Sequence, residues 1–153
     1  MNNIKMKQEF LNLKIAVDFD GTIVEHKYPE IGKEIIFSID TLRKLQELGC
    51  QIILWTFRSG NELEEAVEFC RTKGLEFYAV NKNYPEEVFD ETISRKINAD
   101  VFIDDKNLGG IPDWGLIWQM LDPDGFLQKQ QRADHYFQST GLSKFLNIFK
   151  KNR

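Results

Sequence analysis

The stretch Leu13-Lys14-Ile15-Ala16-Val17-Asp18-Phe19-Asp20-Gly21-Thr22 is the most informative part of this 153-residue chain. Its apolar first half is typical of a buried strand, and the run breaks at Gly21. Asp18 and Asp20 are therefore predicted to lie in the loop at the tip of that strand. Open α/β sheets bind their ligands at the carboxyl ends of parallel strands, so these two acids mark a candidate site.

Apolar runs alternate with helical patterns along the first two thirds of the chain. We predict strands at 13–17, 52–55, 77–80 and 101–103, and helices at 35–48, 63–70 and 85–93. Gly49 and Gly74 suit the ends of the first two helices, Asn61 suits the N-cap of the second, and Pro85 suits the first turn of the third. The alternation is typical of βαβ units. The predicted fold is a Rossmann-like, three-layer α/β/α domain with a central, mostly parallel sheet.

The length of the chain predicts one domain over residues 1–153. The core is expected at about 11–110, followed by a C-terminal extension at about 111–153 in which Phe145 to Phe149 form a short amphipathic helix. No linker or repeat divides the sequence, so a second domain is not expected.

Composition argues against several classes of protein. Cys50 and Cys70 form neither a disulfide framework nor a zinc set, so they are expected to be reduced core thiols in a cytoplasmic protein. No leader and no apolar run of about 20 residues is found, so no membrane association is expected. The net charge of -4 gives no indication of nucleic acid binding.

Polar residues gather near the ends or starts of the predicted strands, and most of them are carboxylates. They are Asp18 and Asp20, Thr56, Lys96, and the adjacent pair Asp104 and Asp105. Each alone has an ordinary explanation, such as a turn or a solvated side chain. Carboxylates that converge on one pocket repel one another unless a cation is present, so the cluster itself predicts a metal. Oxygen ligands favour a hard cation such as Mg2+.

In this order the four features resemble the motifs of the haloacid dehalogenase superfamily. The matching segments are Asp-Phe-Asp-Gly-Thr at 18–22, a strand ending in Thr56, Lys96, and Phe-Ile-Asp-Asp at 102–105. The resemblance implies an enzyme, a Mg2+-dependent phosphohydrolase that cleaves a phosphomonoester. Asp18 would be the nucleophile that forms an aspartyl-phosphate, and Asp20 would be the general acid and then the general base.

The resemblance also implies which residues bind phosphate and metal. Thr56 and Lys96 would hold the transferred phosphoryl group through a hydroxyl and a positive charge. Mg2+ would be bound by Asp18, by the backbone carbonyl of Asp20 and by Asp104.

Three further positions have more than one interpretation. Arg58 lies two residues beyond Thr56, where it would reach a phosphate or a substrate carboxylate, or else form a surface salt bridge. Asp105 is expected to orient Lys96 or to meet the metal through water. Asn81 to Tyr84 follow the third strand and are weighed as substrate contacts, whereas His26 is expected to be an ordinary exposed loop residue.

Members of this superfamily often carry a cap domain, inserted after the first motif or between the second and third. The sequence has room for neither insertion, so no cap domain is expected. The resemblance then implies an open site for a phosphorylated macromolecule, or a site for a small phosphorylated molecule that a neighbouring subunit of a homo-oligomer closes. Residues 25–32 would form a flap beside this site and determine specificity.

Two alternatives to an enzyme use the same acidic site. One is a receiver-like phospho-acceptor domain, and the other is a catalytically inactive binding module. Receiver domains usually carry their adjacent acids after the first strand, whereas Asp104 and Asp105 come late. The substrate itself is not predicted, because fold and catalytic residues do not select a leaving group.

Overall fold

The computed structural model describes residues 10–121. In chain order its elements are β1 (Lys14–Val17), α2 (Ser38–Glu47), β2 (Gln51–Leu54), α3 (Gly60–Thr72), β3 (Ala79–Val80), β4 (Val101–Ile103) and α4 (Trp114–Leu121). The chain divides into two compact units after Gly115, within α4. Among the described residues, no helix has the length and apolar character needed to cross a membrane.

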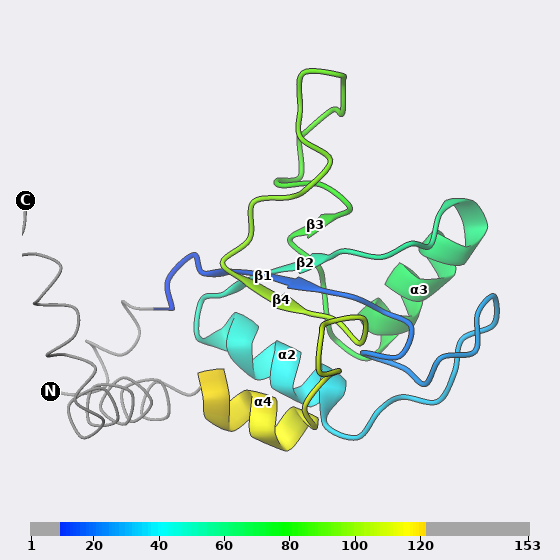
Figure 1. Cartoon of the computed structure of the whole chain (residues 1–153), viewed down its shortest axis with the longest axis vertical. Helices are drawn as coiled ribbons and strands as arrows, with labels where there is room; N and C mark the ends of the chain where they lie inside the picture. The colour runs from blue at the N-terminus through cyan, green and yellow to red at the C-terminus, as the bar shows by residue number, and fades with distance from the viewer. Residues whose placement is uncertain (1–9, 122–153) are drawn as a thin grey trace, which may run out of the picture. The chain divides into compact units, whose positions relative to one another are not determined.

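The four strands form one parallel sheet in the order β3-β2-β1-β4 (Figure 1). Ala16 pairs with Ile53 of β2 and with Phe102 of β4, and Ile53 pairs in turn with Ala79 of β3. Because every pair is parallel, all four strands end at the same edge of the sheet. The predicted Rossmann-like α/β fold with a parallel sheet is confirmed.

The two faces of the sheet are covered by different parts of the chain. Side chains alternate along a strand, so one face carries four fully buried residues, Ile15, Val17, Ile52 and Leu54. The right-handed connections of β1 to β2 and of β2 to β3 place α2 and α3 on one face. On the other face, Ala16, Ile53 and Ala79 pack with Ile97, which comes from the long connection before β4.

The first two predicted helices exist with adjusted ends. α2 begins at Ser38 rather than at residue 35, after Phe37, whose φ of 68° is left-handed and not helical. α3 begins at Gly60, and its N-cap is Ser59 rather than the predicted Asn61. Both cysteines are buried free thiols, as predicted.

The predicted helix at 85–93 is wrong, because this segment contains no helix. In Figure 1 the connection between β3 and β4 runs out from the sheet and back. Local side-chain bonds replace the helical ones: the Glu87 carboxylate accepts from Asn83, and Asp90 accepts from the backbone and hydroxyl of Thr92. Val88 and Phe89 stay exposed, so no apolar face was available to stabilise a helix.

Helix α4 was not predicted from the sequence, although a signal for it is present. Asp113 precedes the helix as a candidate N-cap, and Trp114, Ile117, Trp118 and Leu121 have helical spacing. The predicted helix at 145–149 lies outside the described residues, and the prediction of a single domain stays a prediction.

Candidate functional site

Three carboxylates meet where β1 and β4 end. The two strands are neighbours, and the backbone N–H of Asp18 donates to the Ile103 carbonyl at 3.0 Å. Asp18 thus lies beside Asp104 and Asp105, and one oxygen of each side chain lies within 4.8 Å of the other two. Oxygens at this spacing can share one hard cation.

Asp105 supports this interpretation through an atom that lacks a partner. Its Oδ1 is buried and has no hydrogen-bond partner among the described residues, which is costly unless a cation or water satisfies it. Its backbone N–H donates to the Thr22 hydroxyl at 3.0 Å, which fixes the residue in place. Its Oδ2 accepts from Lys106 and not from Lys96, so the expected orienting role toward Lys96 is wrong.

Gly21 makes room for the Asp105 carboxylate. A Cβ atom on Gly21 would lie 2.5 Å from Asp105 Oδ2, and the φ of 84° at Gly21 is itself unfavourable for any other residue. The glycine of the Asp-x-Asp-Gly segment therefore permits a close approach of backbone to carboxylate. From the sequence alone, Gly21 was interpreted as the residue at which the strand ends and as a possible turn residue.

The half-buried Asp18 has an unusual titration. Burial raises its pKa from 3.8 to about 6, and the neighbouring charges of Asp104 and Asp105 act in the same direction. Hydrogen bonds from the Phe19 backbone and the Thr56 hydroxyl act in the opposite direction. A cation beside Asp18 would favour its ionised form.

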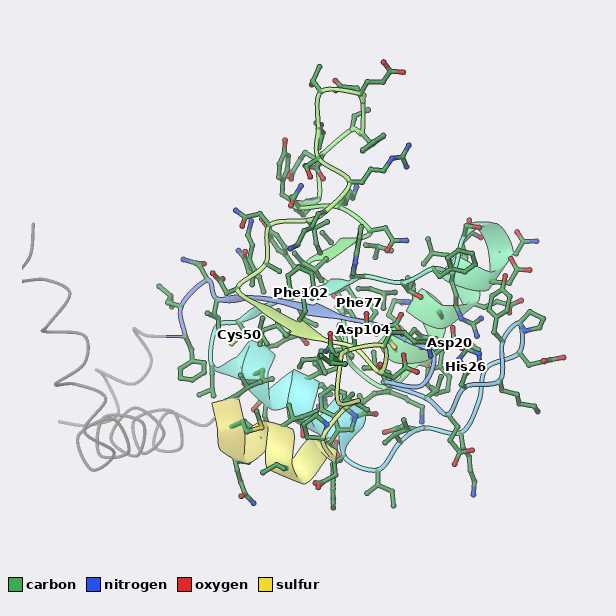
Figure 2. The ribbon with its side chains drawn as sticks, in the orientation of Figure 1. Asp20, His26, Cys50, Phe77, Phe102 and Asp104 are labelled. Carbon is green, nitrogen blue, oxygen red and sulfur yellow. The ribbon has the colours of Figure 1, made fainter. Side chains whose placement is uncertain are left out.

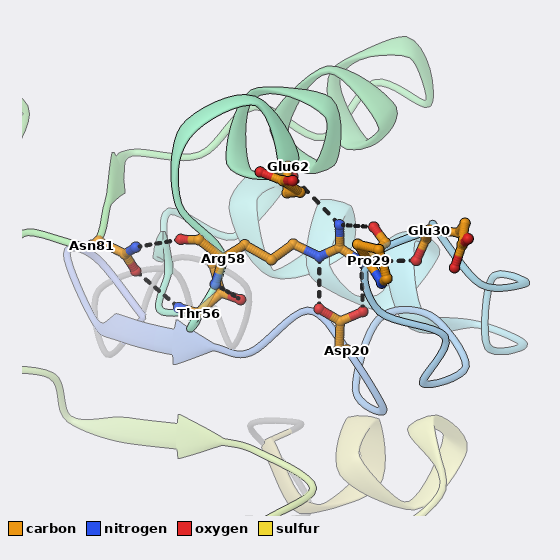
Figure 3. Close-up of polar contacts among 7 residues, drawn as sticks. All are labelled: Asp20, Pro29, Glu30, Thr56, Arg58, Glu62 and Asn81. Carbon is orange, nitrogen blue, oxygen red and sulfur yellow. Dashed lines mark hydrogen bonds and ion pairs between the residues drawn. The ribbon is translucent and has the colours of Figure 1, made fainter.

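Asp20 lies apart from this cluster, in a buried ion pair with Arg58 (Figure 3). Arg58 Nε donates to Asp20 Oδ2 at 2.6 Å and Nη2 donates to Oδ1 at 2.7 Å, a bidentate arrangement. The hydrogen bond with Asp20 raises the pKa of Arg58. Both carboxylate oxygens of Asp20 are thus engaged, and neither is free to face a leaving group in this arrangement.

Arg58 also fixes the loop between β1 and α2. Its guanidinium donates to the carbonyl oxygens of Pro29 and Glu30, both at 2.9 Å, and lies 5.2 Å from the centre of the Tyr28 ring. The base of this loop is closed by a bridge between Val24 and Glu34. Residues 25–32 therefore form a flap whose tip is attached to the site. Arg58 is only 1% exposed, so the surface salt bridge considered for it is wrong.

Asn81 positions the loop that follows β2. Its side-chain oxygen accepts from the backbone N–H of Thr56 at 2.9 Å, and its amide nitrogen donates to the Arg58 carbonyl at 3.5 Å. Thr56 Oγ1 in turn accepts from the backbone N–H of Arg58 at 3.3 Å. The side chain of Asn81 therefore holds Thr56 in place. The sequence had suggested a substrate contact for this residue and not this structural role.

Lys96 is the one predicted site residue that the structure does not bring to the others. It is exposed, its Nζ lies 5.9 Å from the centre of the Phe102 ring, and it is not among the residues that line the cavity described below. Lys106 supplies a cation near the carboxylates instead, through its bond to Asp105. The missing helix at 85–93 removes the element that was expected to deliver Lys96.

A cavity of about 520 Å³ brings these residues together. Figure 2 shows Asp20, His26 and Asp104 at the edge where β1 and β4 end. The polar lining consists of Asp18, Asp20, Thr56, Arg58, Asp104 and Lys106. The rest carries rings, from His26, Tyr28, Trp55 and Phe57, so the exposed His26 belongs to the site after all.

Phe57 is the most exposed of these aromatic residues. Phe57 is among the residues that line the cavity, yet it is 94% exposed. Burying a phenylalanine contributes about 1.5–3 kcal/mol, and folding of this chain leaves that contribution unused. Its neighbours Thr56 and Arg58 are both held by hydrogen bonds, so the exposed ring stands on a fixed backbone.

The class of protein is thus an α/β Rossmann-like domain with an acidic site at the carboxyl ends of its strands. A solved structure described as that of a conserved protein from Bacteroides thetaiotaomicron is 57% identical in sequence to this chain. The similarity covers 74% of this chain and 92% of that one, with a TM-score of 0.70. The chain belongs to the same family as this conserved protein. No model of a known protein family matches it, and no curated protein does so.

Proposed function

We propose that this protein is a member of the haloacid dehalogenase superfamily and a Mg2+-dependent phosphohydrolase that acts on a phosphomonoester. The observation that carries the proposal is the cluster of Asp18, Asp104 and Asp105, two of whose members, Asp18 and Asp104, line one cavity together with a hydroxyl and two cations. A transferred phosphoryl group needs positive charge and hydrogen-bond donors around it, and a carboxylate is a competent covalent acceptor.

Asp18, Asp104 and Asp105 would hold the metal. Their spacing and the unpartnered Asp105 Oδ1 support a hard cation there. This set adds Asp105 to the ligands expected from the sequence, in which Asp20 contributes its backbone carbonyl and not the side chain that bonds to Arg58. When bound, Mg2+ would offset the negative charge of the phosphoryl oxygens and of the three acids.

The residues of the chain would then divide the reaction between them. A carboxylate oxygen of Asp18 attacks the phosphorus, and the bond to the alcohol oxygen breaks. The hydroxyl of Thr56 and the charge of Lys106 would steady the phosphoryl group. Asp20, once it has left Arg58 and taken up a proton, would give that proton to the departing alcohol. Water would then attack the phosphorus of the aspartyl-phosphate, the bond from phosphorus to Asp18 would break, and Asp20 would take a proton from that water. Arg58, once released, would be free to bind the phosphate.

A second candidate function is favoured by the same ion pair. While both oxygens of Asp20 are bonded to Arg58, Asp20 is not available as the general acid that turnover requires. A protein in which this pair persists would accept a phosphoryl group on Asp18 and retain it, as a receiver-like domain does. It would also serve as a binding module for phosphorylated ligands.

One experiment separates these functions. Phosphate release would be measured from an aryl phosphate and a panel of phosphomonoesters, with Mg2+ or with EDTA. The proteins would be the wild type, Asp18→Asn, and Glu86→Gln as a control that removes an exposed carboxylate outside the cavity. We expect Mg2+-dependent release that Asp18→Asn abolishes and Glu86→Gln retains.

Other outcomes assign the alternatives. No release, together with a hydroxylamine-sensitive phosphoryl group acquired from acetyl phosphate, would replace the enzyme with a phospho-acceptor. Neither release nor phosphorylation would leave only a binding module. Release that persists in EDTA and in Asp18→Asn would refute the proposed mechanism.

A further inference from the structure

We propose that the substrate is a small phosphomonoester whose alcohol carries a planar aromatic ring, and that this ring stacks on Phe57. The inference rests on the proposed phosphohydrolase function and names the substrate class for that site. Apart from Thr56 and the charged residues, the cavity is lined by four residues that carry rings, His26, Tyr28, Trp55 and Phe57. A planar group is the ligand chemistry that such a lining recognises.

The position of Phe57 ties ring recognition to phosphate recognition. It directly follows Thr56, whose hydroxyl is a phosphate donor in the proposed reaction, and adjacent Cα atoms lie about 3.8 Å apart. Both residues line the same cavity, so a ligand with its phosphoryl group at Thr56 would share that cavity with Phe57. The cavity volume of about 520 Å³ is within the range of sites that bind small molecules.

The exposure of Phe57 is imposed by its neighbours. Asn81 bonds to the backbone on both sides of it, at Thr56 N and Arg58 O, and Arg58 is anchored by Asp20. The backbone of this segment cannot turn inward without breaking these bonds. A ring held outward on a fixed backbone is preorganised, so little ordering is required when a ligand stacks on it.

The surrounding aromatic residues differ from Phe57 in this respect. The Arg58 guanidinium lies against the Tyr28 ring. Trp55 is partly buried and packs against the core cluster that contains Ala16 and Ile53. These contacts give both residues a role in the fold itself. Phe57 has no aromatic, cation or core contact among those found in residues 10–121, which makes it the side chain whose exposure a ligand best explains.

The test uses two pairs of substrates that differ in the ring and keep the ester linkage. Adenosine 5'-monophosphate is compared with ribose 5-phosphate, and benzyl phosphate with cyclohexylmethyl phosphate. All four are esters of primary alcohols, so the leaving oxygen is matched. kcat/KM would be measured with the full chain and Mg2+ for wild type, Phe57→Trp, Phe57→Leu, and Phe89→Leu, a control at a half-exposed phenylalanine outside the cavity.

We expect wild type to prefer the ring-bearing member of at least one pair by roughly 5- to 100-fold. Phe57→Leu should reduce that ratio toward one, whereas Phe57→Trp and Phe89→Leu should preserve it. Preference within the first pair assigns a nucleoside, and preference within the second alone assigns a simple aryl group. Equal kcat/KM within both pairs, or a preference that survives Phe57→Leu, would overturn the inference.

A binding measurement keeps this test separate from that of the reaction. Asp18→Asn with Mg2+ would be titrated with adenosine 5'-monophosphate, ribose 5-phosphate, benzyl phosphate and cyclohexylmethyl phosphate by calorimetry. If wild type releases no phosphate from any compound, the proposed function fails. Tighter binding of a ring-bearing compound that needs Phe57 would still support ring recognition, and equal binding within both pairs would reject it.

Discussion

Replacing Asp18 by asparagine should stabilise the protein in the absence of divalent metal. Burial raises the pKa of Asp18 from 3.8 to about 6, so holding its negative charge in the folded protein is unfavourable. At about 1.4 kcal/mol for each pH unit, the full difference is about 3 kcal/mol. Asp18 is half-buried, and solvent screening reduces the expected gain to about 1–2 kcal/mol. Asparagine keeps the shape of the side chain and removes its charge.

The gain has a defined dependence on pH. Below pH 3.8 Asp18 is protonated in both the folded and unfolded protein, so the variant and the wild type should be equally stable. As the pH rises toward 6 the unfolded chain loses its proton first, and the wild type loses stability relative to the variant. Above pH 6 the difference should be complete and constant.

The assay is urea unfolding in EDTA across about pH 4 to 8, with Glu86→Gln as the control for loss of one negative charge. Adding Mg2+ should reverse the order, because loss of the Asp18 ligand weakens metal binding, so that Mg2+ stabilises the folded wild type more than the folded variant. Two results in EDTA would refute the electrostatic reasoning. One is that Asp18→Asn is less stable than wild type at about pH 8, and the other is that it exceeds the stability of wild type by the same amount at about pH 4 and pH 8.

Three other predictions concern packing and burial. Arg58→Ala should lower the free energy of unfolding by about 3–5 kcal/mol, because it leaves the buried charge of Asp20 unpaired. In urea unfolding, the double variant Arg58→Ala/Asp20→Ala should lose less stability than the sum of the two single losses. In thermal unfolding, Gly21→Ala should destabilise the protein more than Gly109→Ala by at least about 1 kcal/mol. Both glycines have positive φ, but only at Gly21 would an added Cβ meet other atoms, so equal losses would contradict the prediction. The two cysteine thiols, whose pKa values burial raises to about 11 and about 12, should react with a disulfide reagent at about pH 8 only when urea is added; rapid labelling of the native protein would count against their burial.

The sequence by itself was sufficient for the sheet and for most of the site's acids. Strand patterns such as Leu13 to Val17 depend on local apolar character, and the polar residues that follow them must meet wherever parallel strands end together. For this reason the order of strands and polar residues along the chain was enough to predict Asp18, Thr56 and Asp104 at one edge of the sheet, and they line the same cavity.

Tertiary structure decided the partners of these residues. The pairing of Asp20 with Arg58, the bond from Asn81 to the loop after β2, and the approach of Asp105 to Gly21 each join segments separated by more than 20 residues. No local pattern encodes such contacts, because they depend on how the connections pack after the sheet has formed. The same reason explains the error at 85–93 and the loss of Lys96 from the site: helical spacing was present, but exposed Val88 and Phe89 found no surface to cover.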